Sequence, residues 1–234
     1  YLINRSASAS STGTRIQYFT FDEKWLGEFG NSDSGGDMGF VRPVCVAFDE
    51  FHNLYVTDEA TDEIKVFTKA GQFCRKIGLR NIGLGDLGEN LRFGPSGIYI
   101  DMEGNITVAS RHRNQVVKIT EQGFLLNSFG SAGAEPGQFN MPWGVTIDAQ
   151  ECVYVADWRN DRIQKFERNG DYLGSFGERG SEAGKLSRPS SVAVDDSGFI
   201  AVADWGNERV QIFGQDGSVQ EILYGDATLS QWSK

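Results

Sequence analysis

The stretch Gly137–Gly177 reads GQFNMPWGVTIDAQECVYVADWRNDRIQKFERNGDYLGSFG, and it decides the fold because most of the chain repeats it. A second copy, Gly184–Gly225, has the same apolar pattern and the same ADW-x-N-x-R-x-Q run. Four prolines open the units at steps of 52, 47 and 47 residues: Pro43, Pro95, Pro142 and Pro189. This period fits either a four-stranded propeller blade or a pair of helices. The period alone therefore does not choose between the two.

The composition of each unit favours strands. Four short runs rich in Val, Ile, Tyr and Phe alternate with Asp, Asn and Gly, as in Val145–Ile147, Val153–Val155 and Ile163–Phe166. Such runs are typical of antiparallel strands. Radial packing of four-stranded sheets avoids the long exposed edges of one flat sheet. The sequence therefore predicts an all-β fold, a β-propeller of four-stranded antiparallel blades, whose first and most continuously apolar strand is innermost.

One register of small residues supports close packing of the first strands. It lies two residues after each proline and holds Cys45, Gly97, Gly144 and Ser191. Small side chains there let neighbouring first strands approach one another.

The units resemble NHL repeats, whose pattern runs roughly Pro-x-Gly-Val-Ala-Val-Asp, Gly-Asn-Ile-Tyr-Val-Ala-Asp and Asn-x-Arg-Ile-Gln-Val-Phe. This chain supplies PWGVTID at 142–148, ADWRNDRIQ at 156–164 and ADWGNERVQ at 203–211. Two units depart from the pattern: Glu63 follows Asp58 at the Arg position, and Ser110 and Gln115 replace the Asp and the Arg. The chain is also similar to uncharacterised bacterial NHL-repeat proteins, a likeness that carries no activity.

The resemblance implies a propeller that is six-bladed when intact. Residues 1–234 are then a single propeller domain of about four and three-quarter blades, with the missing strand and last blade outside this sequence. A five-bladed ring, closed irregularly by the tail, is the alternative. We predict a partial blade at 1–30, full blades at 43–78, 95–130, 142–177 and 189–225, and a tail at 226–234.

Composition limits the partners and the compartment. The formal net charge of −10 disfavours a nucleic-acid partner, which needs a basic face. No apolar stretch is long enough for a transmembrane helix. Three scattered cysteines, Cys45, Cys74 and Cys152, argue against a disulfide framework and weakly favour a reducing compartment such as the cytoplasm. The compartment and the oligomeric state are otherwise open.

A loop face is the predicted binding surface. In an antiparallel meander, the turns between second and third strands emerge on the same face as the connections between blades. The atypical segments Ser6–Gly13 and Leu79–Gly94 belong to this face. We expect a non-catalytic binding or scaffolding module that recognises a protein or peptide there, with these candidate residues: Trp158, Arg159, Trp205, Arg111, His112 and Arg113. Packing between adjacent blades is the other interpretation of the two tryptophans.

A repeated polar set suggests a structural brace. Asp and Arg at the two ends of a tight turn can form an ion pair, and the Asn amide can satisfy turn backbone. Chemistry needs one site, whereas a brace is needed in every blade. We therefore assign no catalytic residue and interpret two sets as braces: Asp157, Asn160 and Arg162, and Asp204, Asn207 and Arg209.

Two other functions stay open. A metal-dependent propeller hydrolase or lyase is one, although only His52 and His112 are present, on opposite predicted faces, and no metal ligand or cofactor is assigned. An RNA-binding NHL domain, using the basic run Arg111–Arg113, is the other. The acidic residues that close the first runs are either ordinary turn residues, which we favour, or Ca²⁺ ligands at a central channel: Asp49, Asp101, Asp148 and Asp195.

Overall fold

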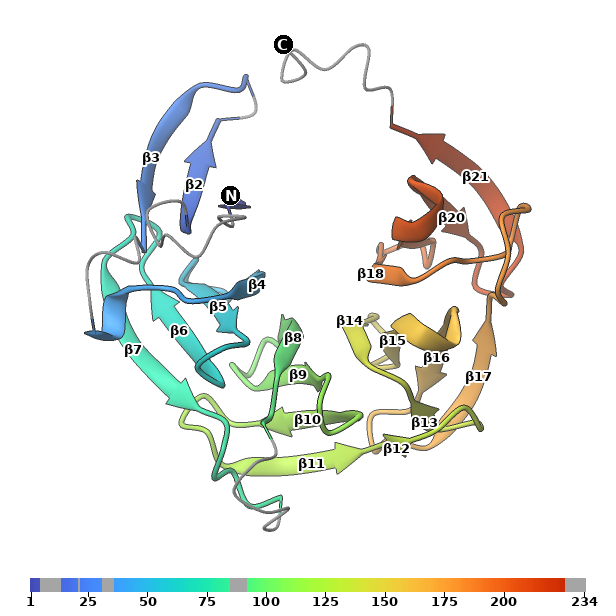
Figure 1. The fold of residues 1–234 in the computed structure, drawn as a ribbon, viewed down its shortest axis with the longest axis horizontal. Helices are drawn as coiled ribbons and strands as arrows, with labels where there is room; N and C mark the ends of the chain where they lie inside the picture. The colour runs from blue at the N-terminus through green and yellow to red at the C-terminus, as the bar shows by residue number, and fades with distance from the viewer. Residues whose placement is uncertain (5–13, 21, 31–35, 85–91, 226–234) are drawn as a thin grey trace. The chain divides into compact units, whose positions relative to one another are not determined.

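The computed structural model describes residues 1–4, 14–20, 22–30, 36–84 and 92–225 (Figure 1). It divides into two compact units, Tyr1–Ser128 and Phe129–Lys234. The predicted tail 226–234, the segment Ser6–Gly13 and part of Leu79–Gly94 lie outside the described residues. The assignment of 1–234 to a single domain and the blade count stay predictions.

The first unit holds one three-stranded and two four-stranded antiparallel sheets. The three-stranded sheet consists of β1 (Leu2–Asn4), β2 (Arg15–Phe19) and β3 (Trp25–Phe29). The first blade consists of β4 (Pro43–Phe48), β5 (Leu54–Asp58), β6 (Glu63–Phe67) and β7 (Phe73–Gly78). The second blade consists of β8 (Pro95–Ile100), β9 (Ile106–Ser110), β10 (Gln115–Ile119) and β11 (Leu125–Phe129). A single 3-10 turn, η3 (Gly36–Met38), precedes β4.

The second unit holds two more four-stranded antiparallel sheets. The third blade consists of β14 (Pro142–Ile147), β15 (Val153–Asp157), β16 (Arg162–Phe166) and β17 (Tyr172–Phe176). The fourth blade consists of β18 (Pro189–Val194), β19 (Ile200–Asp204), β20 (Arg209–Phe213) and β21 (Val219–Tyr224). A short parallel pair, β12 (Ser131–Ala132) and β13 (Gln138–Phe139), precedes the third blade. The predicted all-β fold with four-stranded antiparallel blades is confirmed.

Strand order within each blade follows the chain, so the first and fourth strands are the edges of their sheet (Figure 1). Burial does not follow how continuously apolar a strand is. In the first three blades the second strand is fully buried, and all five residues of β5, β9 and β15 are buried. The first strands keep partly exposed positions, because an edge strand has a neighbour on one side only. Continuous apolarity in sequence therefore does not rank the strands by burial.

Apolar side chains from adjacent blades form the core of each unit. In the second unit, Tyr154 and Ile163 of the third blade pack with Val192, Val202 and Phe213 of the fourth. The small-residue register works there as predicted. A Cβ added to Gly144 would lie 2.7 Å from the Cα of Ser191, so the absence of a side chain lets β14 and β18 approach.

The four acidic residues that close the first strands form the predicted turns. In each turn one carboxylate oxygen accepts two backbone N–H groups at 2.8–3.0 Å, those of the second and fourth residues after the Asp: Asp49, Asp101, Asp148 and Asp195. The third residue after each Asp is left-handed, and it is Gly104 and Gly198 in two blades but His52 and Glu151 in the others. Side-chain acceptors thus satisfy backbone that the ladder leaves unpaired.

All three cysteines are free thiols. Among the described residues, the structure contains no helix of the length and apolarity that a membrane crossing requires.

Candidate functional site

The turns between second and third strands carry the candidate residues of the second unit. In the third blade this turn is η4 (Trp158–Asn160), and in the fourth it is η5 (Trp205–Asn207). Each turn follows a strand that ends in Asp and closes on one left-handed residue, Asp161 or Glu208, both with φ of 54°. Each turn is also tied to the preceding connection, because Arg159 N–H donates to the Asn140 carbonyl at 3.0 Å and Gly206 N–H to that of Ser187 at 2.8 Å. Trp158 and Trp205 therefore occupy the same place on two similar frames.

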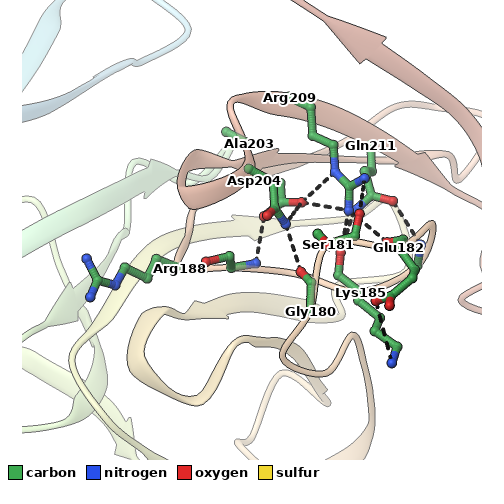
Figure 2. A network of polar contacts seen from close by, with 12 residues as sticks. Gly180, Ser181, Glu182, Lys185, Arg188, Ala203, Asp204, Arg209 and Gln211 are labelled. Atoms are coloured by element: carbon green, nitrogen blue, oxygen red, sulfur yellow. Dashed lines mark hydrogen bonds and ion pairs between the residues drawn. The ribbon is translucent and has the colours of Figure 1, made fainter.

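The predicted brace of the fourth blade is a dense polar network around Asp204 (Figure 2). Asp204 is fully buried, and one oxygen accepts the Ser187 N–H at 2.7 Å. The other oxygen accepts from Asn207 Nδ2 and Arg209 Nε, both at 2.8 Å. The remaining Arg209 nitrogens donate to three backbone carbonyls at 2.8 Å, those of Ser181, Glu182 and Lys185. The network thus fixes the connection that leads into the fourth blade.

The third blade repeats this network. Asp157 accepts from Asn140 N–H at 2.8 Å, Asn160 Nδ2 at 2.8 Å and Arg162 Nε at 2.9 Å. Arg162 also donates to two connection carbonyls, those of Glu135 and Gln138, at 2.9 Å. The six residues predicted as braces are therefore grouped in the structure as two equivalent networks. That these two networks stabilise the fold stays a prediction, which substitution of their residues can test.

A glutamine completes each network, and the sequence reasoning missed it. Gln164 Nε2 donates to Asp157 Oδ2 at 3.0 Å and to the Gln138 carbonyl at 2.7 Å. Gln211 does the same with Asp204 Oδ2 at 3.1 Å and the Lys185 carbonyl at 2.7 Å. Both glutamines are fully buried. The sequence did mark both glutamines, since each ends the repeated ADW-x-N-x-R-x-Q run, but they were assigned no hydrogen-bond partner from the sequence.

Burial dominates the electrostatics of Asp157. Desolvation raises the pKa of this carboxyl above its usual value, and the hydrogen bonds from Asn140, Asn160 and Arg162 oppose the shift. Burying a charged pair costs solvation that the pairing repays only in part, whereas removing one partner leaves a buried charge uncompensated. The network is therefore expected to specify the geometry of the connection more than to add net stability.

The first two blades, which depart from the sequence pattern, solve the same problem differently. In the first blade the buried Lys65 lies at the position of Gln164 and Gln211, with its Nζ 3.7 Å from Asp58 Oδ2. Lys65 also donates to the Gly39 carbonyl. In the second blade the Ser110 hydroxyl donates to the Phe93 carbonyl in place of the carboxylate. The sequence reasoning noted Glu63 at the Arg position but missed the lysine two residues later.

A pocket of about 760 Å³ opens in the second unit between the turns of the third and fourth blades. Three predicted binding residues line it, Trp158, Arg159 and Trp205. The connection before β18 contributes Arg179, Ser187 and Arg188 to the lining. The remaining lining residues are Asn140, Asp161, Arg179, Ser187, Arg188, Gly206 and Glu208. The volume lies within the usual range of small-ligand sites.

The tryptophans of the pocket have different surroundings. The Trp158 ring lies 5.5 Å from that of Trp143 and 6.5 Å from that of Trp205. The guanidinium groups of Arg159 and Arg188 lie 5.7 Å and 5.3 Å from the Trp158 ring centre. Trp205 stays 58% exposed. Trp158 thus packs between blades, whereas Trp205 presents a ring to solvent.

Three arginines line the pocket without an ion pair to any residue that the structure describes: Arg159, Arg179 and Arg188. Two carboxylates share the lining, and Asp161 Oδ1 already accepts the backbone N–H of Arg188 at 2.7 Å. Arg188 is fixed at its backbone while its side chain points away from the Asp204 network (Figure 2). The pocket therefore offers guanidinium groups to a ligand.

The other three predicted binding residues lie in the first unit and do not line this pocket. Arg111 Nη1 pairs with Glu59 Oε2 at 3.0 Å, and His112 Nε2 lies 3.8 Å from Glu59 Oε1. Arg113 N–H donates to the Ser110 hydroxyl at 3.2 Å. The basic run is thus partly neutralised by Glu59, which is buried. Its role in binding stays a prediction.

Among the described residues, no group of three or more His, Cys, Asp or Glu side chains is placed to hold a metal ion. His52 lies in the turn between β4 and β5, and His112 in the turn between β9 and β10, so the two histidines are at different ends of their strands.

Comparison with known proteins identifies the repeat and the fold. The NHL repeat model matches residues 139–166 and 186–213, which lie in the third and fourth blades. A streptogramin B lyase structure is similar at a TM-score of 0.62 and 14% identity, over 91% of this chain and 63% of that one. Virginiamycin B lyase from Staphylococcus aureus is similar at 0.61 and 16%, over 93% and 64%. A protein of unknown function from Bacteroides caccae is similar at 0.64 and 15%, over 95% and 72%.

This chain thus spans less than two thirds of the length of the two lyase structures. At 14–16% identity these likenesses show the fold alone. A search of curated protein sequences gives no match.

Proposed function

We propose that this chain, whose third and fourth blades match the NHL repeat model, is a non-catalytic binding or scaffolding module. It recognises a protein or peptide through the loop face of its third and fourth blades. The observation that carries the proposal is the pocket of about 760 Å³ with the half-exposed Trp205 in its wall. Exposed tryptophans are enriched among residues that dominate binding energy.

The frame under the pocket supports recognition. Trp158 and Trp205 sit on short turns whose flanking Asp residues, Asp157 and Asp204, are fully buried and fully hydrogen-bonded. A binding group held on a rigid frame loses little conformational entropy when its partner docks. Loop residues on such a frame are where binding function concentrates.

The two alternative functions have less support. The lyase structures share the fold at 14–16% identity, and a shared fold does not carry their activity over to this chain. An RNA-binding domain is opposed by the formal net charge of −10.

A random peptide library displayed on phage tests the proposal with the intact chain as bait. We expect enriched peptides that bind the wild type and bind Trp205→Ala at least about ten times more weakly, the effect typical of a central aromatic contact. Phe199→Ala is the matched control, because Phe199 is an exposed aromatic of the same blade outside the pocket lining. It should bind like the wild type. Circular dichroism of both variants confirms that they are folded.

Two results would contradict the proposal. Either no peptide is enriched over an unrelated propeller, or the enriched peptides bind Trp205→Ala and Phe199→Ala equally well. Tight binding of a mixed RNA oligonucleotide, weakening steeply with salt, would favour the RNA-binding alternative instead.

A further inference from the structure

We infer that the tryptophan and arginine pocket takes an acidic peptide segment, in which a carboxylate is bound by Arg159 and Arg188 beside an apolar or aromatic side chain that stacks on Trp205. This inference rests on the proposed function and deepens it by naming the chemistry of the ligand. Nothing in the fold or in the repeat match requires this chemistry. It follows from how the side chains of this pocket are already paired.

The first step concerns the sign of the ligand charge. A ring of tryptophans with carboxylates nearby resembles a cage for a cationic ligand, because cations bind aromatic faces. Here the chain itself supplies the cations, since the guanidinium groups of Arg159 and Arg188 lie 5.7 Å and 5.3 Å from the centre of the Trp158 ring. A second cation at this ring would meet two positive charges. An anion would meet two planar donors.

The second step concerns the size of the ligand charge. The lining holds three arginines against Asp161 and Glu208, a formal balance of +1. The second unit as a whole has nine basic and sixteen acidic residues, a net charge of −7. Long-range repulsion therefore disfavours a polyanion such as a nucleic acid, which needs several phosphates neutralised. A single carboxylate, with a charge of −1, matches the formal charge of +1 on the pocket lining.

The third step concerns the apolar part of the ligand. Trp205 is 58% exposed, and the centre of its ring lies 6.5 Å from that of Trp158. The fourth blade has Gly206 where the third has Arg159, so no guanidinium of its own turn covers Trp205. A Cβ at Gly206 would lie 2.3 Å from Ser187 Oγ, which explains why this position has no side chain. The exposed ring is left for a ligand group.

Both blades are needed for this site. Arg159 comes from the turn of the third blade, Arg188 from the connection between the blades, and Trp205 from the turn of the fourth. Asp161 fixes Arg188 by accepting its backbone N–H at 2.7 Å. The carboxylate and the apolar group of a ligand therefore bind to different blades. This arrangement selects a peptide with the two groups on neighbouring residues.

The test uses a random hexapeptide library with blocked termini, so that side chains carry all the charge. We expect peptides enriched by the wild type to place Glu or Asp next to Phe, Tyr, Trp or Leu. The affinity of a resynthesised winner should fall at least about tenfold when its acidic residue becomes the amide, because its charge-assisted hydrogen bonds to the arginines are lost. Titration calorimetry on the intact chain measures this ratio.

Variants assign the preference to its residues. The double substitution Arg159→Gln, Arg188→Gln should bring the ratio between acidic and amide peptides close to one. Arg168→Gln is the matched control, because Arg168 is an exposed arginine of the same unit that pairs with Glu151 outside the pocket. It should leave the ratio unchanged. A circular dichroism melt of each variant shows whether the fold is retained, and Arg188→Lys alone replaces the double variant if it unfolds, with a reduced ratio expected.

The outcomes separate this inference from the proposed function. Peptides that bind through Trp205 but tolerate the amide equally well would overturn the acidic ligand and leave the binding module standing. Enrichment of Lys or Arg peptides would overturn it in the same way. A failure to enrich any peptide would remove both proposals. Competition of the winning peptide by an RNA oligonucleotide at the same pocket would also overturn the inference.

Discussion

The second unit and the first unit differ in how they hold the turn between second and third strands. In the second unit, Asp204 and its equivalent Asp157 each collect donors from an Asn, an Arg and a Gln. In the first unit, Asp58 has the buried Lys65 instead, and Ser110 uses a neutral hydroxyl. The same backbone turn is therefore compatible with an Asp bonded by Asn, Arg and Gln, with an Asp beside a buried lysine, and with a serine hydroxyl.

This difference shows which part of the repeat is required by the fold. All four blades keep an oxygen at the end of the second strand, and that oxygen bonds the backbone of the connection: in Asp58, Ser110, Asp157 and Asp204. The cation that faces this oxygen is exchangeable. The residue match to the NHL model falls only in the two blades with the complete set.

The largest expected effect is at Lys65. Lys65→Met removes the cation beside the fully buried Asp58 and leaves the backbone donors of Val41, Arg42 and Ala60, at 2.8, 2.9 and 3.2 Å. We expect a loss of about 3–5 kcal/mol in the free energy of unfolding, measured by urea titration, because one partner of a buried pair is removed. Lys69, an exposed lysine of the same blade, gives the control: Lys69→Met should change the free energy of unfolding by no more than about 0.5 kcal/mol. A loss of unfolding free energy no larger than that of Lys69→Met would contradict the pairing of Lys65 with Asp58.

The next effect compares the two arginines of the second unit. Arg209 is nearly inaccessible and bonds three carbonyls, whereas Arg162 is 14% exposed at its side chain and bonds two. We expect Arg209→Gln to cost about 3 kcal/mol and Arg162→Gln about 2 kcal/mol, since each lost charged hydrogen bond leaves buried acceptors. Hydrogen exchange of the preceding connection should rise in both variants. The opposite ranking would show that burial does not set the strength of the brace.

The smallest effect is in the second blade. Ser110→Ala removes the hydroxyl that donates to the Phe93 carbonyl and accepts the Arg113 N–H at 3.2 Å. We expect a loss of about 1–2 kcal/mol in urea titration, the cost of leaving neutral buried groups unpaired. Thr120→Ala removes a half-buried hydroxyl of the same blade that accepts the Phe124 N–H at 3.2 Å, and it should cost less. A Ser110→Ala loss as large as that of Lys65→Met would mean that charge is not the source of the difference between blades.

Much of the fold was predictable because its signals are local and repeated. Strand composition, the spacing of the prolines and the Asp turns give the blades, since turn chemistry depends on a few adjacent residues. The brace was predictable for Asp157 and Arg162 because the two residues flank one short turn. Lys65 was not, because its partner carbonyl, that of Gly39, lies 26 residues earlier in the chain.

The candidate site was predictable only in part. Trp158 and Trp205 were found because they occupy the same position of the repeat, and Arg159 because it follows Trp158 in the same turn. Arg188 was missed, because it precedes β18 and reaches Trp158 of another blade only through the fold. The burial of each strand was not predictable for a similar reason, since exposure depends on which neighbours cover a strand and the composition of a strand does not show this.

The buried amine of Lys65 has a practical consequence. Its side chain is 2% exposed, so an acylating reagent reaches the nitrogen only when the first blade opens. Mass spectrometry of a timed acetylation should therefore find this lysine modified long after Lys69. The rate of its modification would report how often the sheet of the first blade opens, without a spectroscopic label on the protein.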